Sequence, residues 1–265
     1  PNDTYIFYAL LHQSIDTLGI TFEPYFADIA ELNRMAYERE LDITKISYNA
    51  LLDLTQSHVL LDAGGALGRG CGPLLIAKQE MDVPSLHEKS IAIPGEKTTA
   101  NFLLNYYLRD DVDKIILPFD QIEDAVLSGD VDAGVIIHEN RFTYAQRGLI
   151  ALQDLGSHWE LTTGSPIPLG GIIGKRTIEN ATLKRVDELI KASLSYAHQH
   201  RSEILPFIRS HAQEMEESVI WQHVELYVNN FSAGLGVEGR DAINTLYRVA
   251  KETGRISTYQ SPFLT

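Results

Sequence analysis

The arrangement of apolar residues changes near residue 178, and this change constrains the fold more than any other feature of the chain. Before it, short apolar runs bounded by turn residues predict buried strands. These runs are 58–62, 74–77, 90–93, 114–117 and 133–137. Helical patterns lie between several of them, for example at 28–40, where Asp28 and Glu31 stand in capping-box positions. An α/β fold with parallel sheets is therefore predicted. From Ile178 onward apolar residues recur at helical spacing, which predicts a C-terminal helical layer.

Two interruptions of the strand-helix alternation indicate that the chain passes out to a second lobe and returns. The first lies near Pro84, and the second is the Ser165-Pro166-Ile167-Pro168 segment. We therefore predict crossings at 78–90 and 164–176. The predicted lobes are residues 1–85 plus 175–265, and residues 86–174. In such a two-lobed α/β fold a ligand binds in a cleft between the lobes, beyond the carboxyl ends of strands.

The amino-acid composition excludes some classes of binding partner. The chain has 265 residues, of which 44% are hydrophobic, enough for a substantial core. Its net charge of -14 leaves no basic surplus for nucleic acid or an anionic membrane, so neither is expected. A small anionic ligand remains compatible, because local donors in a cleft decide its binding. Cys71 is the single cysteine, so no internal disulfide is possible and a cytoplasmic location is expected. The oligomeric state is not indicated.

His138 directly follows the predicted strand at 133–137 and begins a polar cluster. A neutral imidazole at a sheet edge can accept a proton near physiological pH, and Glu139 or Arg141 could adjust its charge or orientation. The alternative is a structural histidine hydrogen-bonded at a strand end, which position alone favours. A zinc-binding helix is not indicated, because Phe142 stands where a second histidine is required.

Hydroxyl-bearing residues at two predicted helix starts are candidates for binding an anion. Thr98, Thr99 and Ala100 follow a predicted strand and open a helix, where free N–H groups, the helix dipole and two hydroxyls suit a carboxylate or phosphate. Alternatively, Thr98 only caps its own helix. Ser47 ends a shorter strand-like run and has the same two interpretations, an anion donor or an N-cap.

Three further residues are weaker candidates. Arg69 lies in the glycine-rich run 64–72 and could pair with a ligand carboxylate, although solvated arginines are more common. The run does not match a phosphate-binding loop, because the required lysine and hydroxyl residue are missing. Asn2 and Asp3 could cap the first helix or contribute polar groups to the cleft.

The remaining histidines do not predict a metal site. His198 and His200 lie two residues apart and would point to different faces of a helix. His211 and His223 are isolated in the sequence. We therefore expect no metal site.

Several of these segments together resemble the 1,4-dihydroxy-6-naphthoate synthase family, which acts late in the futalosine route to menaquinone. The resemblance covers essentially the whole chain, and the block from Ile137 to Tyr144 that contains His138 is its most specific part. The other matching segments are 1–4, 32–34, 44–48, 64–70, 98–100 and 227–229. The resemblance implies the fold of type II periplasmic solute-binding proteins, with a closable ligand cleft between two lobes.

The same resemblance implies a cofactor-independent carbon-carbon lyase. Its substrate would be cyclic dehypoxanthine futalosine, split into 1,4-dihydroxy-6-naphthoate and dihydroxyacetone. The resemblance makes His138 the base rather than a structural histidine, and it places Ser47, Thr98, Thr99 and Ala100 beside the ligand. Two alternatives remain: a chorismate dehydratase-like enzyme of the same pathway, and a solute-binding protein that captures a small acid without transforming it.

Overall fold

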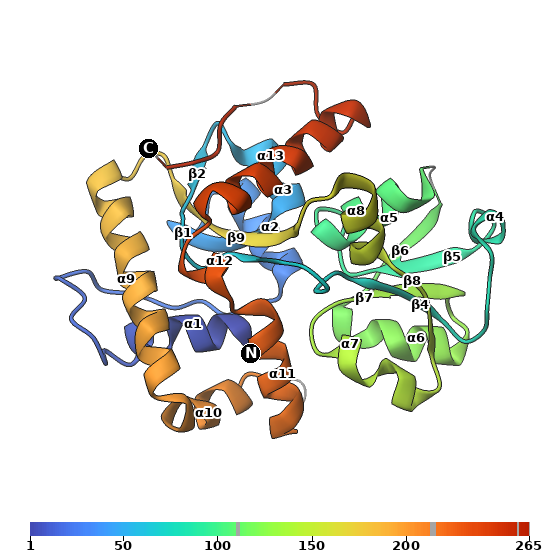
Figure 1. The fold of residues 1–265 in the computed structure, drawn as a ribbon, viewed down its shortest axis with the longest axis horizontal. Coiled ribbons are helices and arrows are strands. Elements are labelled where there is room, and N and C mark those ends of the chain that lie inside the picture. The colour runs from blue at the N-terminus through green and yellow to red at the C-terminus, as the bar shows by residue number, and fades with distance from the viewer. Residues whose placement is uncertain (110–111, 213–215, 259, 265) are drawn as a thin grey trace.

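Two β-sheets organise the chain, and helices pack against both (Figure 1). The computed structural model describes residues 1–109, 112–212, 216–258 and 260–264. The four-stranded sheet has the order β1-β9-β2, with β3 also paired to β9; its strands are β1 (Ile43–Ser47), β9 (Ile167–Lys175), β2 (His58–Leu60) and β3 (Ala66–Gly68). The five-stranded sheet has the order β6-β5-β7-β4-β8; its strands are β6 (Asp113–Ile116), β5 (Ser90–Ile93), β7 (Ala133–Ile136), β4 (Leu74–Ala77) and β8 (Ile150–Asp154).

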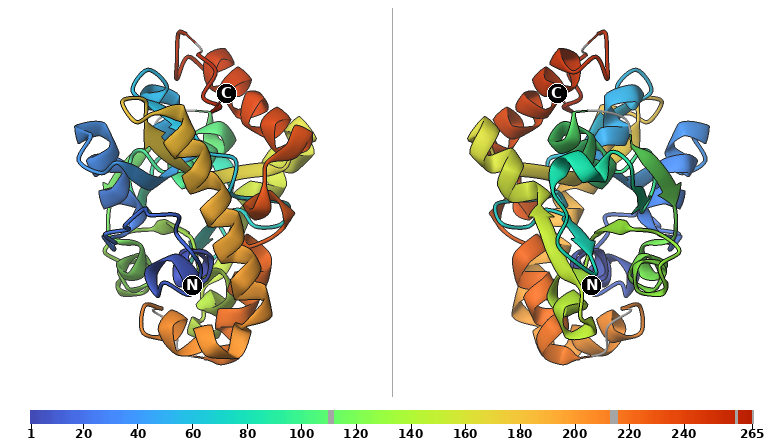
Figure 2. Two further views of the ribbon diagram at one scale, coloured as in Figure 1. Left: turned by 90° about the vertical axis from the view of Figure 1, so that its left-hand side faces the viewer. Right: turned by 90° about the vertical axis from the view of Figure 1, so that its right-hand side faces the viewer.

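Helices connect the strands and then form the predicted C-terminal layer. The helices before β9 are α1 (Asn2–Leu11), α2 (Ile29–Glu38), α3 (Tyr48–Leu54), α4 (Val83–Leu86), α5 (Thr99–Leu108), α6 (Ile122–Ser128), α7 (Asn140–Thr143) and α8 (Leu155–Thr163). Those after it are α9 (Asn180–Gln199), α10 (Arg201–Arg209), α11 (Glu217–Tyr227), α12 (Asn230–Ala233) and α13 (Gly236–Glu252). In the side views, α9 runs along one face and leads to α10 and α11 at the bottom (Figure 2). None of the helices in the described ranges is long and apolar enough to cross a membrane.

Local sequence signals locate many of these elements. The predicted strands at 74–77 and 90–93 coincide with β4 and β5. The helix predicted at 28–40 is α2, where Asp28 accepts a hydrogen bond from the Glu31 N–H at 2.9 Å and thereby caps the helix. The Glu31 side chain does not complete a capping box but pairs with Arg34.

Strand direction differs from the prediction. Among the named strands of the described ranges, parallel pairing occurs only between β5 and its two neighbours β6 and β7, whereas β4 is antiparallel to β7 and β8. β9 is antiparallel to all three of its partners. The alternation of strands and helices predicts parallel pairing only while successive strands join one sheet in one direction. Here the chain changes sheets before β4 and again before β9, and the first strand after each change is antiparallel to its neighbours.

The interruption predicted at 164–176 contains β9, which is the central strand of the four-stranded sheet. The prolines of this segment indicated an interruption, but Pro168 lies within β9 opposite Leu67, beside an irregularity in the β3–β9 pairing. A proline, which has no N–H, is tolerated at such a position. Gly170 is required here, because a Cβ would lie 2.8 Å from the Ile46 carbonyl oxygen.

The strand pairing also places the first change of sheet earlier in the chain than the sequence analysis predicted. The predicted boundary put 74–77 in the first lobe and a crossing at 78–90, whereas β4 pairs within the five-stranded sheet and the 78–90 segment joins β4 to β5. The chain changes sheets between Gly68 and Leu74. There Gly72 packs so closely against Gly156 that a Cβ on Gly72 would lie 2.4 Å from the Gly156 Cα. The segments leading out of and back into the first sheet therefore touch through their backbones.

Candidate active site

A cavity of about 440 Å³ lies where elements of both sheets converge. On one side it is lined by α1, β1 and β9, and on the other by the start of α5 and the segment after β7. Seven of the predicted site residues line it, namely Asn2, Asp3, Ser47, Thr98, Thr99, Ala100 and His138. Arg69 and Arg141 are not among its lining residues. The cavity has the size of a site for a small organic molecule.

His138 lies just past the carboxyl end of β7 and is half-buried. Its backbone has φ = 58°, in the left-handed region that non-glycine residues seldom adopt. The imidazole packs edge-on against the Phe119 ring, with centroids 5.1 Å apart. Burial lowers the pKa of His138 below 6.5, and the neighbouring Glu139 carboxylate partly opposes this effect. The imidazole is therefore neutral at pH 7 and able to accept a proton.

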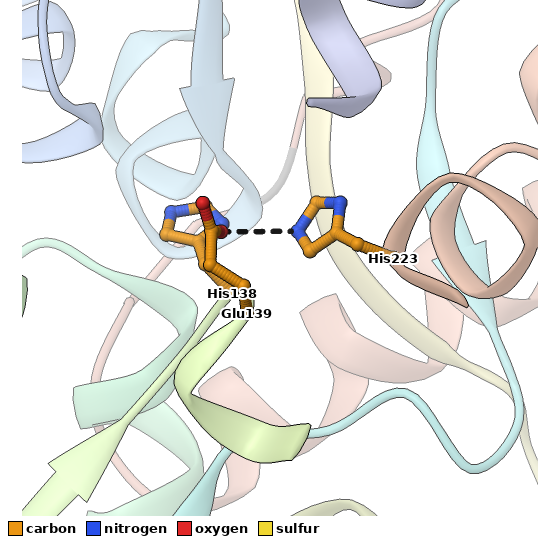
Figure 3. Close-up of side chains that lie close together, drawn as sticks. All are labelled: His138, Glu139 and His223. Carbon is orange, nitrogen blue, oxygen red and sulfur yellow. Dashed lines mark ion pairs between the residues drawn. The ribbon is translucent and has the colours of Figure 1, made fainter. Parts of the chain in front are cut away.

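His223 is not isolated in space, contrary to its appearance in the sequence. It projects from α11 towards Glu139, with its Nε2 3.7 Å from the Glu139 Oε2, and its ring lies 6.0 Å from that of His138 (Figure 3). Burial holds the pKa of His223 well below 6.5. The nearest ligand-type atoms of the three residues lie within 4.8 Å of one another. Two histidines and a carboxylate are also residue types that bind Zn²⁺.

The start of α5 faces the cavity, but the two threonine hydroxyls are already engaged within the protein. Thr98 Oγ1 donates to the Gly95 carbonyl at 2.7 Å and accepts from the Asn101 N–H, so the capping interpretation is confirmed. Thr99 Oγ1 donates to the Leu169 carbonyl at 2.7 Å. The first N–H groups of a helix have no partner within that helix. These backbone groups, rather than the hydroxyls, are suited to an anion here.

Ser47 presents its hydroxyl differently. It precedes α3 without making a side-chain cap, so the capping interpretation is wrong for this residue. Instead, its Oγ accepts from the Asn33 Nδ2 at 3.1 Å, and its N–H donates to the Asn33 Oδ1 at 2.9 Å. This pair leaves the hydroxyl hydrogen of Ser47 to donate towards the cavity it lines.

Lys45 supplies a cation that the sequence analysis missed. Its side chain is 8% exposed, and its Nζ donates to the Asp3 carboxylate at 2.8 Å and to the Gly64 carbonyl at 2.9 Å. Asp3 lies within α1 and does not cap it, so the cleft interpretation of Asp3 agrees with the structure. Lys45 and Ser47 are two residues apart on β1 and point to the same side. This spacing of two residues on a predicted strand could have identified Lys45 as a cavity residue from the sequence.

The two predicted arginines have structural partners. Arg141 donates to the Asp154 carboxylate at 2.9 Å and to the Gly72 carbonyl, and so ties α7 to the edge strand and to the change of sheet. Arg69 is 51% exposed and lies 3.6 Å from Glu238. Arg141 lies in the polar cluster after β7 and Arg69 in the glycine-rich run. Partners distant in sequence hold both arginines outside the cavity lining.

Comparison with known proteins assigns the family. A profile described as menaquinone biosynthesis matches residues 1–252. The chain belongs to this menaquinone biosynthesis family. Two relatives, both named 1,4-dihydroxy-6-naphthoate synthase, come from Thermus thermophilus and Streptomyces coelicolor. The first is 43% identical over 254 residues, 96% of this chain and 92% of the relative. The second is 42% identical over 264 residues, 97% of this chain and 92% of the relative. These names identify the chain as an enzyme of menaquinone biosynthesis.

Solved structures confirm the predicted fold class for this family member. Protein AF1704 from Archaeoglobus fulgidus superposes with a TM-score of 0.91 at 32% identity, over 96% of this chain and 95% of that one. The alkanesulfonate-binding protein SsuA from Xanthomonas axonopodis pv. citri, bound to MOPS, superposes with a TM-score of 0.71 at 15% identity, over 99% of this chain and 93% of that one. The second likeness concerns the fold alone. The menaquinone biosynthesis enzyme thus has the fold of periplasmic binding proteins.

Proposed function

We propose that the protein catalyses the 1,4-dihydroxy-6-naphthoate synthase reaction, in which cyclic dehypoxanthine futalosine is split into 1,4-dihydroxy-6-naphthoate and dihydroxyacetone. The observation that carries the proposal is the neutral imidazole of His138 at the wall of the cavity. A histidine with a pKa below physiological pH is unprotonated there and acts as the general base. The naphthoate product is aromatic, which supplies driving force without a redox partner or another cofactor.

Substrate recognition in this proposal depends on a carboxylate. The residues at the start of α5, Ser47 and Lys45 all line the cavity with His138. A helix start and a cation both favour a bound anion. Fixing the carboxylate among these groups would hold the reacting carbon beside the imidazole, which removes part of the entropic barrier. Approach of the two lobes would then exclude water.

The relatives' names support this substrate over chorismate, which a dehydratase-like enzyme would use. The neutral base at the cavity wall supports an enzyme over a protein that only captures a small acid, because binding a carboxylate does not need a neutral imidazole. The same cavity could hold either carboxylated ring compound, so the reaction itself must be measured.

Turnover of the proposed substrate is the direct test. The protein is incubated with cyclic dehypoxanthine futalosine, and separately with chorismate, and products are separated by chromatography and identified by mass. We expect 1,4-dihydroxy-6-naphthoate from the first substrate and no conversion of the second. Conversion of chorismate would assign the related dehydratase reaction. Tight binding of either compound by the folded protein without turnover would assign a binding protein.

A further inference from the structure

His223 occupies a position that ordinarily requires hydrogen-bonding partners. Its side chain is fully buried in α11, at 0% exposure. In the part of the chain that the structure describes, neither of its ring nitrogens has a hydrogen-bond partner. Buried polar groups in folded proteins nearly always have one, and leaving them unpaired is unfavourable. A buried imidazole with two unpaired nitrogens beside an active site therefore calls for a functional explanation.

A group able to satisfy His223 comes from the other sheet. α11 packs against α1 and against β3 of the four-stranded sheet, whereas Glu139 follows β7 of the five-stranded sheet. The contact between the His223 Nε2 and the Glu139 Oε2 thus joins the two lobes across the edge of the cavity (Figure 3). Its 3.7 Å length exceeds that of an N–H···O hydrogen bond by about 0.5–1 Å. A small approach of the lobes would form a charge-assisted bond.

Glu139 is the residue through which such a bond would reach the base. It is the immediate neighbour of His138, whose backbone is held in the left-handed region. An unfavourable backbone conformation persists only where its surroundings fix it. Anchoring the Glu139 side chain to α11 would fix the peptide that joins it to His138, and so the direction in which that imidazole points.

We propose that His223 is a positioning residue for the reaction proposed above, whose Nε2–H donates to Glu139 when the lobes approach and thereby holds His138 in its productive orientation. His223 does not line the cavity. The contact links closure of the two lobes to the geometry of the base. Catalytic geometry would then be completed only when the cleft is closed around its ligand.

Paired substitutions test this inference. His223→Phe keeps a ring of similar size and removes the donor, His223→Gln restores a donor, and Glu139→Gln weakens the acceptor. His58→Phe is the matched control, because His58 is likewise buried at 1% exposure with an unpaired Nε2, but lies on β2 and does not line the cavity. We expect His223→Phe to lower kcat at least tenfold with KM changed less than threefold. His223→Gln should recover most of the loss, and His58→Phe should leave kcat within twofold.

The double variant His223→Phe/Glu139→Gln should lose no more than the more damaging single variant, because both changes remove one interaction. A wild-type kcat in His223→Phe, or losses that multiply in the double variant, would overturn the proposal. An equal loss in His58→Phe would do the same by showing a general effect of core damage.

A readout without substrate separates this inference from the proposed reaction. The ring ¹⁵N shifts of His138, identified by their loss in His138→Asn, report its tautomer in protein saturated with 1,4-dihydroxy-6-naphthoate. We expect one dominant tautomer in the wild type and a mixture in His223→Phe and Glu139→Gln. An unchanged tautomer in both variants would contradict the positioning role, even if the synthase reaction were demonstrated. A changed tautomer would support it even if the protein acted on another carboxylated ring.

Discussion

Asn33 and Ser47 form a reciprocal pair of hydrogen bonds at the wall of the cavity, in which the amide of Asn33 both donates to the Ser47 Oγ and accepts from its N–H. Asn33 is 2% exposed, so its amide is held in one position. The pair occupies an acceptor site of the hydroxyl and leaves its hydrogen to donate to a ligand.

We expect Ser47→Ala to raise KM about tenfold with little change in kcat, because one hydrogen bond to a charged group contributes about 1.5–3 kcal/mol. Steady-state kinetics with cyclic dehypoxanthine futalosine measure this effect. Ser202→Ala, an exposed serine on α10, is the control and should behave as the wild type. An unchanged KM in Ser47→Ala would remove this hydroxyl from the binding site.

The backbone N–H at the start of α5 can be tested apart from the threonine side chain. Thr99 is the first residue of α5, and Thr98 before it has extended backbone angles, so proline is sterically compatible at position 99. Thr99→Pro removes the N–H and the hydroxyl, whereas Thr99→Ala removes the hydroxyl alone. We expect KM for Thr99→Pro to be about tenfold above that of Thr99→Ala, an energy of about 1.4 kcal/mol. Equal KM values in the two variants would show that this N–H does not bind the substrate.

The pH dependence of kcat/KM should report the lowered pKa of His138. The base is active when unprotonated, so activity is full above its pKa and falls as pH decreases through it. Burial places that pKa below 6.5. We therefore expect the acidic limb of kcat/KM to have its midpoint below pH 6.5. A midpoint above 6.5 would show that His138 is not neutral in the way the structure indicates.

His58 should make folding stability depend on pH. Burial lowers the pKa of His58 from 6.5 to about 4, so the unfolded chain takes up a proton at a higher pH than the folded protein does. The stabilising contribution is complete above pH 6.5 and is lost as pH falls towards 4. After allowance for solvent screening, we expect His58→Phe to lose about 2 kcal/mol less stability than the wild type between pH 7 and pH 4.5. Urea unfolding at the two pH values measures the difference, and equal losses would contradict it.

The structural features that depend only on residues close together in sequence could be predicted from the sequence. The strands β4 and β5, the N-cap Asp28 and the position of His138 after β7 all follow from short patterns and are confirmed by the structure. Each of these features depends on a few consecutive side chains whose burial or capping can be read locally.

Features that depend on contacts between distant segments were not predictable in this way. The central strand β9 contains a proline that indicated an interruption, and only its pairing with three other strands identifies it as a strand. His223 joins Glu139 through the approach of α11 to the segment after β7, which no local pattern encodes. Arg141 lies near His138 in sequence, yet its guanidinium forms an ion pair with Asp154 instead of lining the cavity. Lys45 differs from these features, because its spacing from Ser47 on one predicted strand was a local pattern from which its place in the cavity could have been predicted.

The central claim, that His138 is the base and not a binding or structural group, is tested most directly by His138→Asn. Asparagine tolerates the left-handed backbone conformation at this position but cannot act as a base near neutral pH. Turnover of cyclic dehypoxanthine futalosine and calorimetric affinity for 1,4-dihydroxy-6-naphthoate are measured together in the wild type and the variant. We predict that kcat falls about 10²–10⁴-fold while the Kd of the product changes less than about threefold. A folded variant that retains wild-type kcat would contradict the claim, as would one that loses turnover only in proportion to its loss of affinity.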